Sequence, residues 1–178
     1  MYYKKFIEFL KTHNIYDEEI VKYFNNNSTR FDYLEEEYRP FIGVYYMTEG
    51  DILTKVKPMV PFINSDKTVL INIHEYIHLY LIYNKINKPV NIMTRDREVL
   101  PIFYEKVFVK ENPSLELLKY HEHLNESIYN EGQDEYLLAL KLSNELIDSY
   151  ENDDIKKLNH KVKRLVLKDN FSRLVNGK

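Results

Sequence analysis

Apolar residues near the middle of the chain follow the pattern of β-strands. Residues 41–47 and 52–56 are rich in aromatic and β-branched side chains, and a short polar turn separates the two segments. They are predicted to pair as a hairpin. Pro58 and Pro61 follow, so a continuation of the second strand through residues 62–63 is expected at the edge of a sheet, where a missing N–H can be tolerated.

Most of the remaining chain has helical periodicity, in which apolar residues recur every three or four positions. Residues 25–28, Pro113 and Gly132 interrupt this pattern, and residues 31–38 fit neither period. The helices expected are residues 4–11, 17–24, 65–84, 94–109, 114–130, 133–152 and 154–174. A small sheet followed mainly by helices predicts an α+β fold dominated by helix.

The composition is that of an ordinary globular protein, with 178 residues, 44% of them hydrophobic and 30% charged. We expect one domain over residues 1–178: N-terminal helices and a small sheet in 1–64, a helix pair in 65–110, and C-terminal helices in 111–178. There is no cysteine, which excludes disulfides and thiolate metal sites. Histidine and carboxylate are therefore the remaining strong metal ligands.

Charge and hydropathy limit the expected partners and location. The net charge of -3 argues against nucleic acid as the main partner. Residues 1–11 carry charges throughout, unlike a signal peptide, and no apolar run is long enough to span a bilayer. We expect a cytoplasmic protein without a membrane span, and the sequence leaves its oligomeric state open.

The most informative motif is His74-Glu75-Tyr76-Ile77-His78, which has the H-E-x-x-H form of a zinc-binding helix. Two histidines four positions apart lie on one face of a helix, so both rings can bind one metal ion. Glu75 is then placed to accept the proton of an attacking water molecule. The flanking residues are apolar, which predicts a mostly buried helix. The alternative is a buried helix with two hydrogen-bonded histidines.

A catalytic zinc site needs a third protein ligand. Glu98 is favoured, because nineteen residues separate it from His78, enough for a loop and a second helix that Thr94 would cap. Glu105 lies seven residues further on, in nearly the same direction around that helix. It is expected to hydrogen-bond a ligand histidine, or to be the ligand with Glu98 in support. Pro101, between them, is expected to bend or end the first turns of the helix.

The remaining histidines are weaker candidates. His121 and His123 are two residues apart, so they do not face the same way on a helix, although one of them could reach the site. His13 and His160 belong to no such pattern, and both are predicted to be surface residues.

An H-E-x-x-H motif followed by a glutamate on the next helix resembles the gluzincin class of zinc metallopeptidases, over about residues 65–140. The gap between His78 and Glu98 is similar to that of the thermolysin family, although Ile102 stands where that family has an aspartate. The resemblance implies a zincin-like fold, with a small sheet before the active-site helix, a glutamate helix and further C-terminal helices. It also implies Zn²⁺ as the cofactor and a peptide or protein as the substrate.

Residues 98–105 resemble the thimet oligopeptidase and oligoendopeptidase F family, which has a ligand glutamate, a nearby proline and a second glutamate seven residues on. Tyr129 and Tyr136 repeat the spacing of two active-site tyrosines in that family, and His123 is similar to its preceding histidine. The resemblance implies that Tyr136, Tyr129 or His123 stabilises the oxyanion. The chain departs from the family at Tyr76-Ile77, where the family has a glycine, and it is far smaller than a full oligopeptidase.

The function expected from the motif is hydrolysis of peptide bonds, with Glu75 as general base. One alternative is a regulatory protease specific for a single protein partner. Another is a non-catalytic binding module, because residues 154–178 carry eight Lys or Arg against two Asp on an amphipathic helix. That helix is more often packed on its own domain, and a pseudoenzyme is a third alternative.

Overall fold

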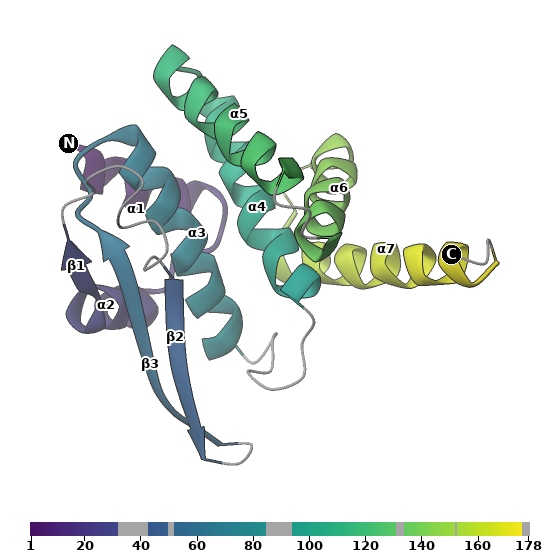
Figure 1. Ribbon diagram of the computed structural model, residues 1–178. Helices are drawn as coiled ribbons and strands as arrows, with labels where there is room; N and C mark the ends of the chain where they lie inside the picture. The colour runs from purple at the N-terminus through teal and green to yellow at the C-terminus, as the bar shows by residue number, and fades with distance from the viewer. Residues whose placement is uncertain (32–42, 50–51, 85–93, 131–133, 152, 176–178) are drawn as a thin grey trace.

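The computed structural model describes residues 1–31, 43–49, 52–84, 94–130, 134–151 and 153–175. In this part of the chain the fold is α+β and dominated by helix, with a small sheet, as the sequence predicts (Figure 1). The elements in chain order are α1 (Tyr2–Thr12), α2 (Glu18–Asn27), β1 (Thr29–Phe31), β2 (Gly43–Glu49), β3 (Ile52–Pro61), α3 (Asp66–Tyr83), α4 (Thr94–Glu111), α5 (Leu115–Asn130), α6 (Asp134–Asp148) and α7 (Ile155–Val175).

The sheet has three strands in the order β1-β3-β2, and β3 pairs parallel with β1 and antiparallel with β2. The hairpin of β2 and β3 was expected. The expected continuation through residues 62–63 at the edge of the sheet is wrong, because β3 ends at Pro61 and is the central strand. The two prolines are tolerated because each has a strand on one side only. The pairing with β1 begins after Pro58, and the pairing with β2 ends before Pro61.

Two other expectations about element ends need correction. The helix expected to reach residue 152 ends at Asp148, where the N–H groups of Ser149 and Tyr150 donate to the carbonyls of Leu146 and Ile147. Such i→i−3 bonds tighten a last helical turn. Thr94 is the first residue of α4 rather than a cap before it, and Pro101 does not end this helix.

Helix α3 is central to the arrangement. It packs against β2 and β3 on one side, against α1 and α2 on another, and against α4 and α5 (Figure 1). Its aromatic residue Tyr76 is fully buried among Phe6 and Phe24, and its hydroxyl donates to the carbonyl of Ile15 at 2.9 Å. The helices α1 and α2 therefore pack against the side of α3 that carries Tyr76.

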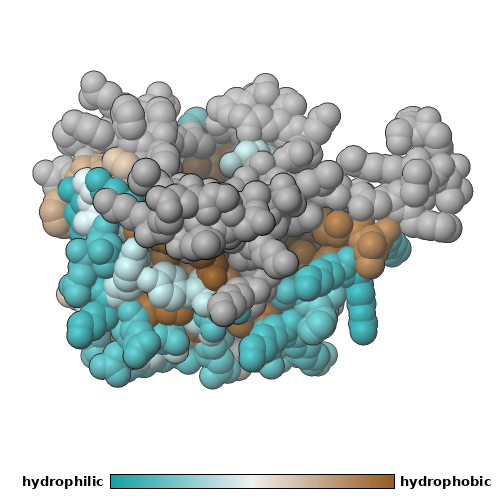
Figure 2. Space-filling view, turned by 90° about the horizontal axis from the view of Figure 1, so that it is seen from below, coloured by the Kyte–Doolittle hydropathy of each residue, from teal (hydrophilic) through white to brown (hydrophobic). Residues whose placement is uncertain are grey.

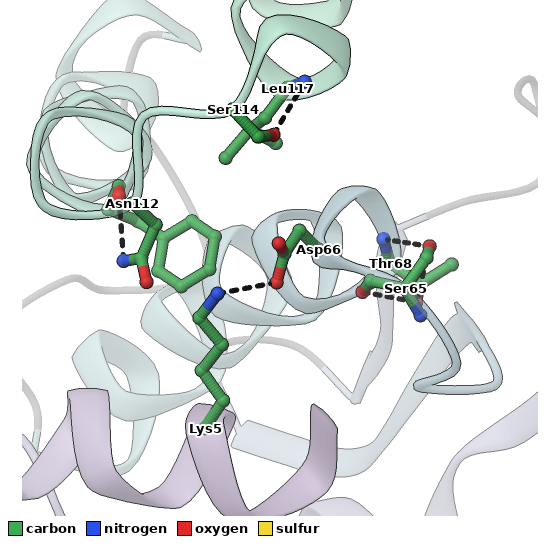
Figure 3. Close-up of polar contacts among 8 residues, drawn as sticks. Lys5, Ser65, Asp66, Thr68, Asn112, Ser114 and Leu117 are labelled. Atoms are coloured by element: carbon green, nitrogen blue, oxygen red, sulfur yellow. Dashed lines mark hydrogen bonds and ion pairs between the residues drawn. The ribbon is translucent and has the colours of Figure 1, made fainter. Parts of the chain in front are cut away.

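The start of α3 is held by a capping box (Figure 3). The backbone N–H of Thr68 donates to the Ser65 hydroxyl at 3.2 Å, and the N–H of Ser65 donates to the Thr68 hydroxyl at 2.9 Å. Both groups would otherwise be unpaired N–H groups at the helix start. Lys5 on α1 also binds the Asp66 carboxylate at 2.7 Å, which ties the first turn of α3 to the N-terminal helix.

The C-terminal helices form the other side of the structure. α4 packs on α3 and α6, and α7 packs on α4 and α6. The first part of α7 packs against the domain, where Ile155, Leu158 and Val162 are buried. Further along the same helix, Leu167 is 68% exposed. In Figure 2, hydrophilic residues fill much of the lower part of the face, and hydrophobic residues are visible beside them. Among the described helices, none combines the length and the apolar character that a membrane crossing requires.

Candidate metal centre

Three side chains from two helices meet at one point. His74 and His78 project from the same face of α3, and their Nε2 atoms are 3.1 Å apart. Glu98, near the start of α4, places its Oε2 atom 3.2 Å from Nε2 of His74 and 3.4 Å from Nε2 of His78. The packing of α4 on α3 thus brings together the two motif histidines and the glutamate favoured from the sequence.

The spacing of these three atoms fits a zinc ion. Ligand atoms placed tetrahedrally about 2.0–2.1 Å from zinc lie about 3.3 Å from one another. The three distances, 3.1, 3.2 and 3.4 Å, bracket that value. Two imidazoles and one carboxylate are also a donor set that zinc commonly takes in catalytic sites. The residues present are therefore suited to hold Zn²⁺ while leaving a fourth position for water or substrate.

Glu105 contacts His74 on the side of the ring that faces away from the three ligand atoms. Its Oε1 atom is 2.8 Å from Nδ1 of His74. A hydrogen bond at Nδ1 favours the tautomer in which Nε2 carries a free lone pair, as a metal ligand requires. Of the two carboxylates weighed from the sequence, Glu98 thus lies in the triangle and Glu105 lies behind His74.

The charges of the cluster shift its pKa values in opposite directions. Burial alone would lower the pKa of His74, but the nearby carboxylates of Glu105, Glu98 and Glu75 raise it well above its usual value. Burial opposes the ionisation of Glu98, yet the two histidines bring the pKa of this carboxyl below its usual range. Glu98 is therefore ionised, and the cluster as a whole favours a positive charge at its centre.

Glu75 is buried beside the triangle, with 7% of its surface exposed. Burial raises the pKa of its carboxyl, and His74 and His78 offset part of that rise. Among the residues that the structure describes, none hydrogen-bonds its carboxylate. A buried carboxylate with a raised pKa and no hydrogen-bond partner there is suited to take and release a proton.

The residues proposed to stabilise an oxyanion lie on the next two helices. Tyr136 is half-buried on α6, and His123 is exposed on α5. Tyr129 belongs to α5, but its side chain lies outside the described part. Their role stays a prediction. His121, two residues before His123, is the more buried of the two, because the two residues face different sides of α5.

One histidine was placed wrongly by the sequence. His13 was expected at the surface but is only 2% exposed. Its Nδ1 atom is 2.8 Å from the Tyr150 hydroxyl, and its Nε2 atom is 3.0 Å from the Glu111 carboxylate. Its partners lie far away in the sequence, so no local pattern indicates its burial. His160 is exposed, as expected.

Comparison with models of protein families, with curated proteins and with solved structures finds no match to this chain. The residues of the site themselves are therefore what indicates a function.

Proposed function

We propose that this protein is a zinc-dependent peptidase of the gluzincin type with a zincin-like fold. His74, His78 and Glu98 are the ligands in this proposal, and Glu105 orients His74. The observation that carries it is the triangle of ligand atoms, whose sides match those expected around zinc. A peptide or protein is the proposed substrate.

Zinc, when bound at such a site, polarises a carbonyl oxygen and makes water more acidic. The protein supplies the proton transfer. Glu75 accepts a proton from the water that attacks the peptide carbonyl and then delivers it to the leaving amine. Burial raises the pKa of Glu75 and so brings it closer to the working pH, where one carboxyl group can both accept and release a proton. Tyr136, Tyr129 or His123 is the proposed hydrogen-bond donor to the oxyanion.

The first test is the metal content of protein purified without chelator or a histidine tag. We expect about one zinc ion per chain by elemental mass spectrometry, as a three-ligand site predicts. His78→Ala should lose the ion, because it removes one of three ligands. His160→Ala, which changes an exposed histidine, is the matched control and should retain it.

The second test separates metal binding from catalysis. Glu75→Gln should keep the zinc and lower peptide hydrolysis by at least about a hundredfold, because the amide cannot accept the proton. Hydrolysis would be followed with peptide libraries and with unfolded proteins. Full activity of Glu75→Gln contradicts the mechanism. Wild-type protein that takes up no zinc contradicts the whole proposal and leaves a hydrogen-bonded histidine pair.

A further inference from the structure

Among the residues that the structure describes, the exposed leucines lie on two helices. Leu115 and Leu118 on α5 are 71% and 40% exposed, and Leu167 on α7 is 68% exposed. Both helices pack on the domain through other faces, since α5 buries Leu117 and the first part of α7 packs on α4 and α6. The exposed leucines therefore belong to helix faces that the domain itself does not cover.

The exposed face of α7 is basic. Leu167 follows Lys163 by four positions and Lys168 follows Arg164 by four, so these residues share one broad face of the helix. All four side chains are exposed. The face thus surrounds one apolar side chain with three cations.

The exposed face of α5 combines leucine with glutamate. Leu115, Leu118, Glu122 and Glu126 are three or four positions apart, which places them along one side of the helix. All four are exposed. Over the whole of α5, three glutamates stand against one lysine, Lys119. The face is therefore apolar near the start of the helix and acidic further along.

The two faces are complementary in charge. Residues 154–178 carry eight Lys or Arg against two Asp, a net charge of +6, so the remaining residues must carry -9 to give the total of -3. Two α7 faces would repel each other, whereas an α7 face attracts an α5 face. Figure 1 shows the C-terminal half of α7 extending beyond the other helices, so a second molecule can reach it.

We propose that the basic face of α7 docks on the acidic face of α5 in a second copy of this chain. Each face has a leucine and a charged residue four positions apart, in opposite order along the chain. Antiparallel packing of the two helices therefore sets Leu167 against Leu118 and, in the same register, Lys163 against Glu122. Two copies that dock reciprocally make this contact twice, which closes a dimer. The inference does not depend on the proposed zinc site.

The test is analytical ultracentrifugation of the full chain over a range of concentrations. Wild type is expected to self-associate reversibly, and less so as the salt concentration rises, because salt screens exposed charges. Lys163→Glu combined with Arg164→Glu places negative charge opposite Glu122 and should weaken association at least about tenfold. Leu167→Gln leaves the charge unchanged, removes the apolar contact, and should also weaken association.

The matched control makes the same change in net charge elsewhere. Lys22→Glu combined with Lys57→Glu alters exposed lysines on α2 and β3 and should leave association within about twofold of wild type. Thermal unfolding checks that each variant is folded. A control that weakens association as much as the α7 variant does overturns the inference.

A charge exchange tests the pairing of the two faces directly. Glu122→Lys combined with Glu126→Lys should weaken association as the α7 variant does. Joining both pairs of substitutions in one chain restores opposite charges across the contact and should recover most of the lost affinity. No recovery, or a wild type that stays monomeric at every concentration, overturns the inference. Monomeric protein that binds vesicles of anionic phospholipid through Lys163 and Arg164 also overturns it and assigns the α7 face to a lipid surface.

Discussion

At the scale of single residues, His74 has both ring nitrogens engaged. Nε2 faces His78 and Glu98, and Nδ1 faces Glu105. Each contact has a different consequence, because the first places a lone pair in the ligand triangle and the second decides which tautomer is present. The carboxylates around the ring also favour a proton on it in the absence of metal.

Zinc affinity should therefore depend on pH at values above those of an ordinary histidine. A raised pKa means that protons compete for His74 above its usual value of 6.5, so affinity should keep rising as the pH increases through 7. Calorimetry in two buffers of different ionisation enthalpy would count the protons released on zinc binding. In Glu105→Gln the pKa of His74 falls and fewer protons should be released at pH 7. Equal proton release by wild type and Glu105→Gln would contradict this explanation.

At the scale of elements, α3 is a helix that is buried on most of its surface and yet carries two residues of the candidate metal centre, His74 and His78. Asn72 is a buried polar residue of α3 whose hydrogen bonds are all within the protein. Its side-chain amide donates to the carbonyls of Pro61 and Thr68 and accepts from Arg30. The helix start is fixed by Ser65, and the cap sets where the first turn begins. The position of the helix start matters because it sets the direction in which each later side chain of α3, including that of His74, leaves the helix.

Ser65→Ala should lower the free energy of unfolding by about 1 kcal/mol, because the N–H of Thr68 loses its acceptor. For a chain of this size that corresponds to a melting temperature about 2–4 °C lower. Ser149→Ala is the matched control, because its hydroxyl donates to carbonyls and its removal leaves no N–H unpaired. Its stability should stay within about 0.5 kcal/mol of wild type. An equal decrease in the free energy of unfolding in the two variants would show that the hydrogen bond of the Ser65 cap does not contribute to stability.

At the scale of the whole molecule, His13 joins segments that are distant in the sequence. It lies at the end of α1, its partner Glu111 ends α4, and its partner Tyr150 follows α6. Asn14, with a φ of 55°, turns the chain away just after it, a conformation that asparagine tolerates better than most residues. The N-terminal helices are thus fastened to the C-terminal ones at a point away from α3.

His13→Leu should destabilise the protein by about 1–3 kcal/mol, because the hydrogen bonds from the buried His13 ring to Tyr150 and Glu111 are lost. Urea unfolding would give the free energy, provided that the slope with denaturant stays unchanged. His160→Leu changes an exposed histidine and should leave stability within about 0.5 kcal/mol of wild type. A loss of stability in His160→Leu as large as that in His13→Leu would contradict the structural role assigned to His13.

The sequence by itself determined the features that depend on local geometry. The period of apolar residues predicted the helices and the hairpin, and the four-residue spacing placed His74 and His78 on one face. The helix expected from residue 65 is α3, which Ser65 caps. Helical period and capping involve neighbours in the chain, so they can be recognised without a fold.

Only the tertiary structure decided how the elements meet. It placed Glu98 beside both histidines and Glu105 behind His74, whereas the sequence had left their roles open. It also made β3 a central strand and buried His13. These outcomes depend on the rotation and register of one packed element against another. Residues far apart in the chain set that relation jointly, so no single segment carries a pattern that reveals it.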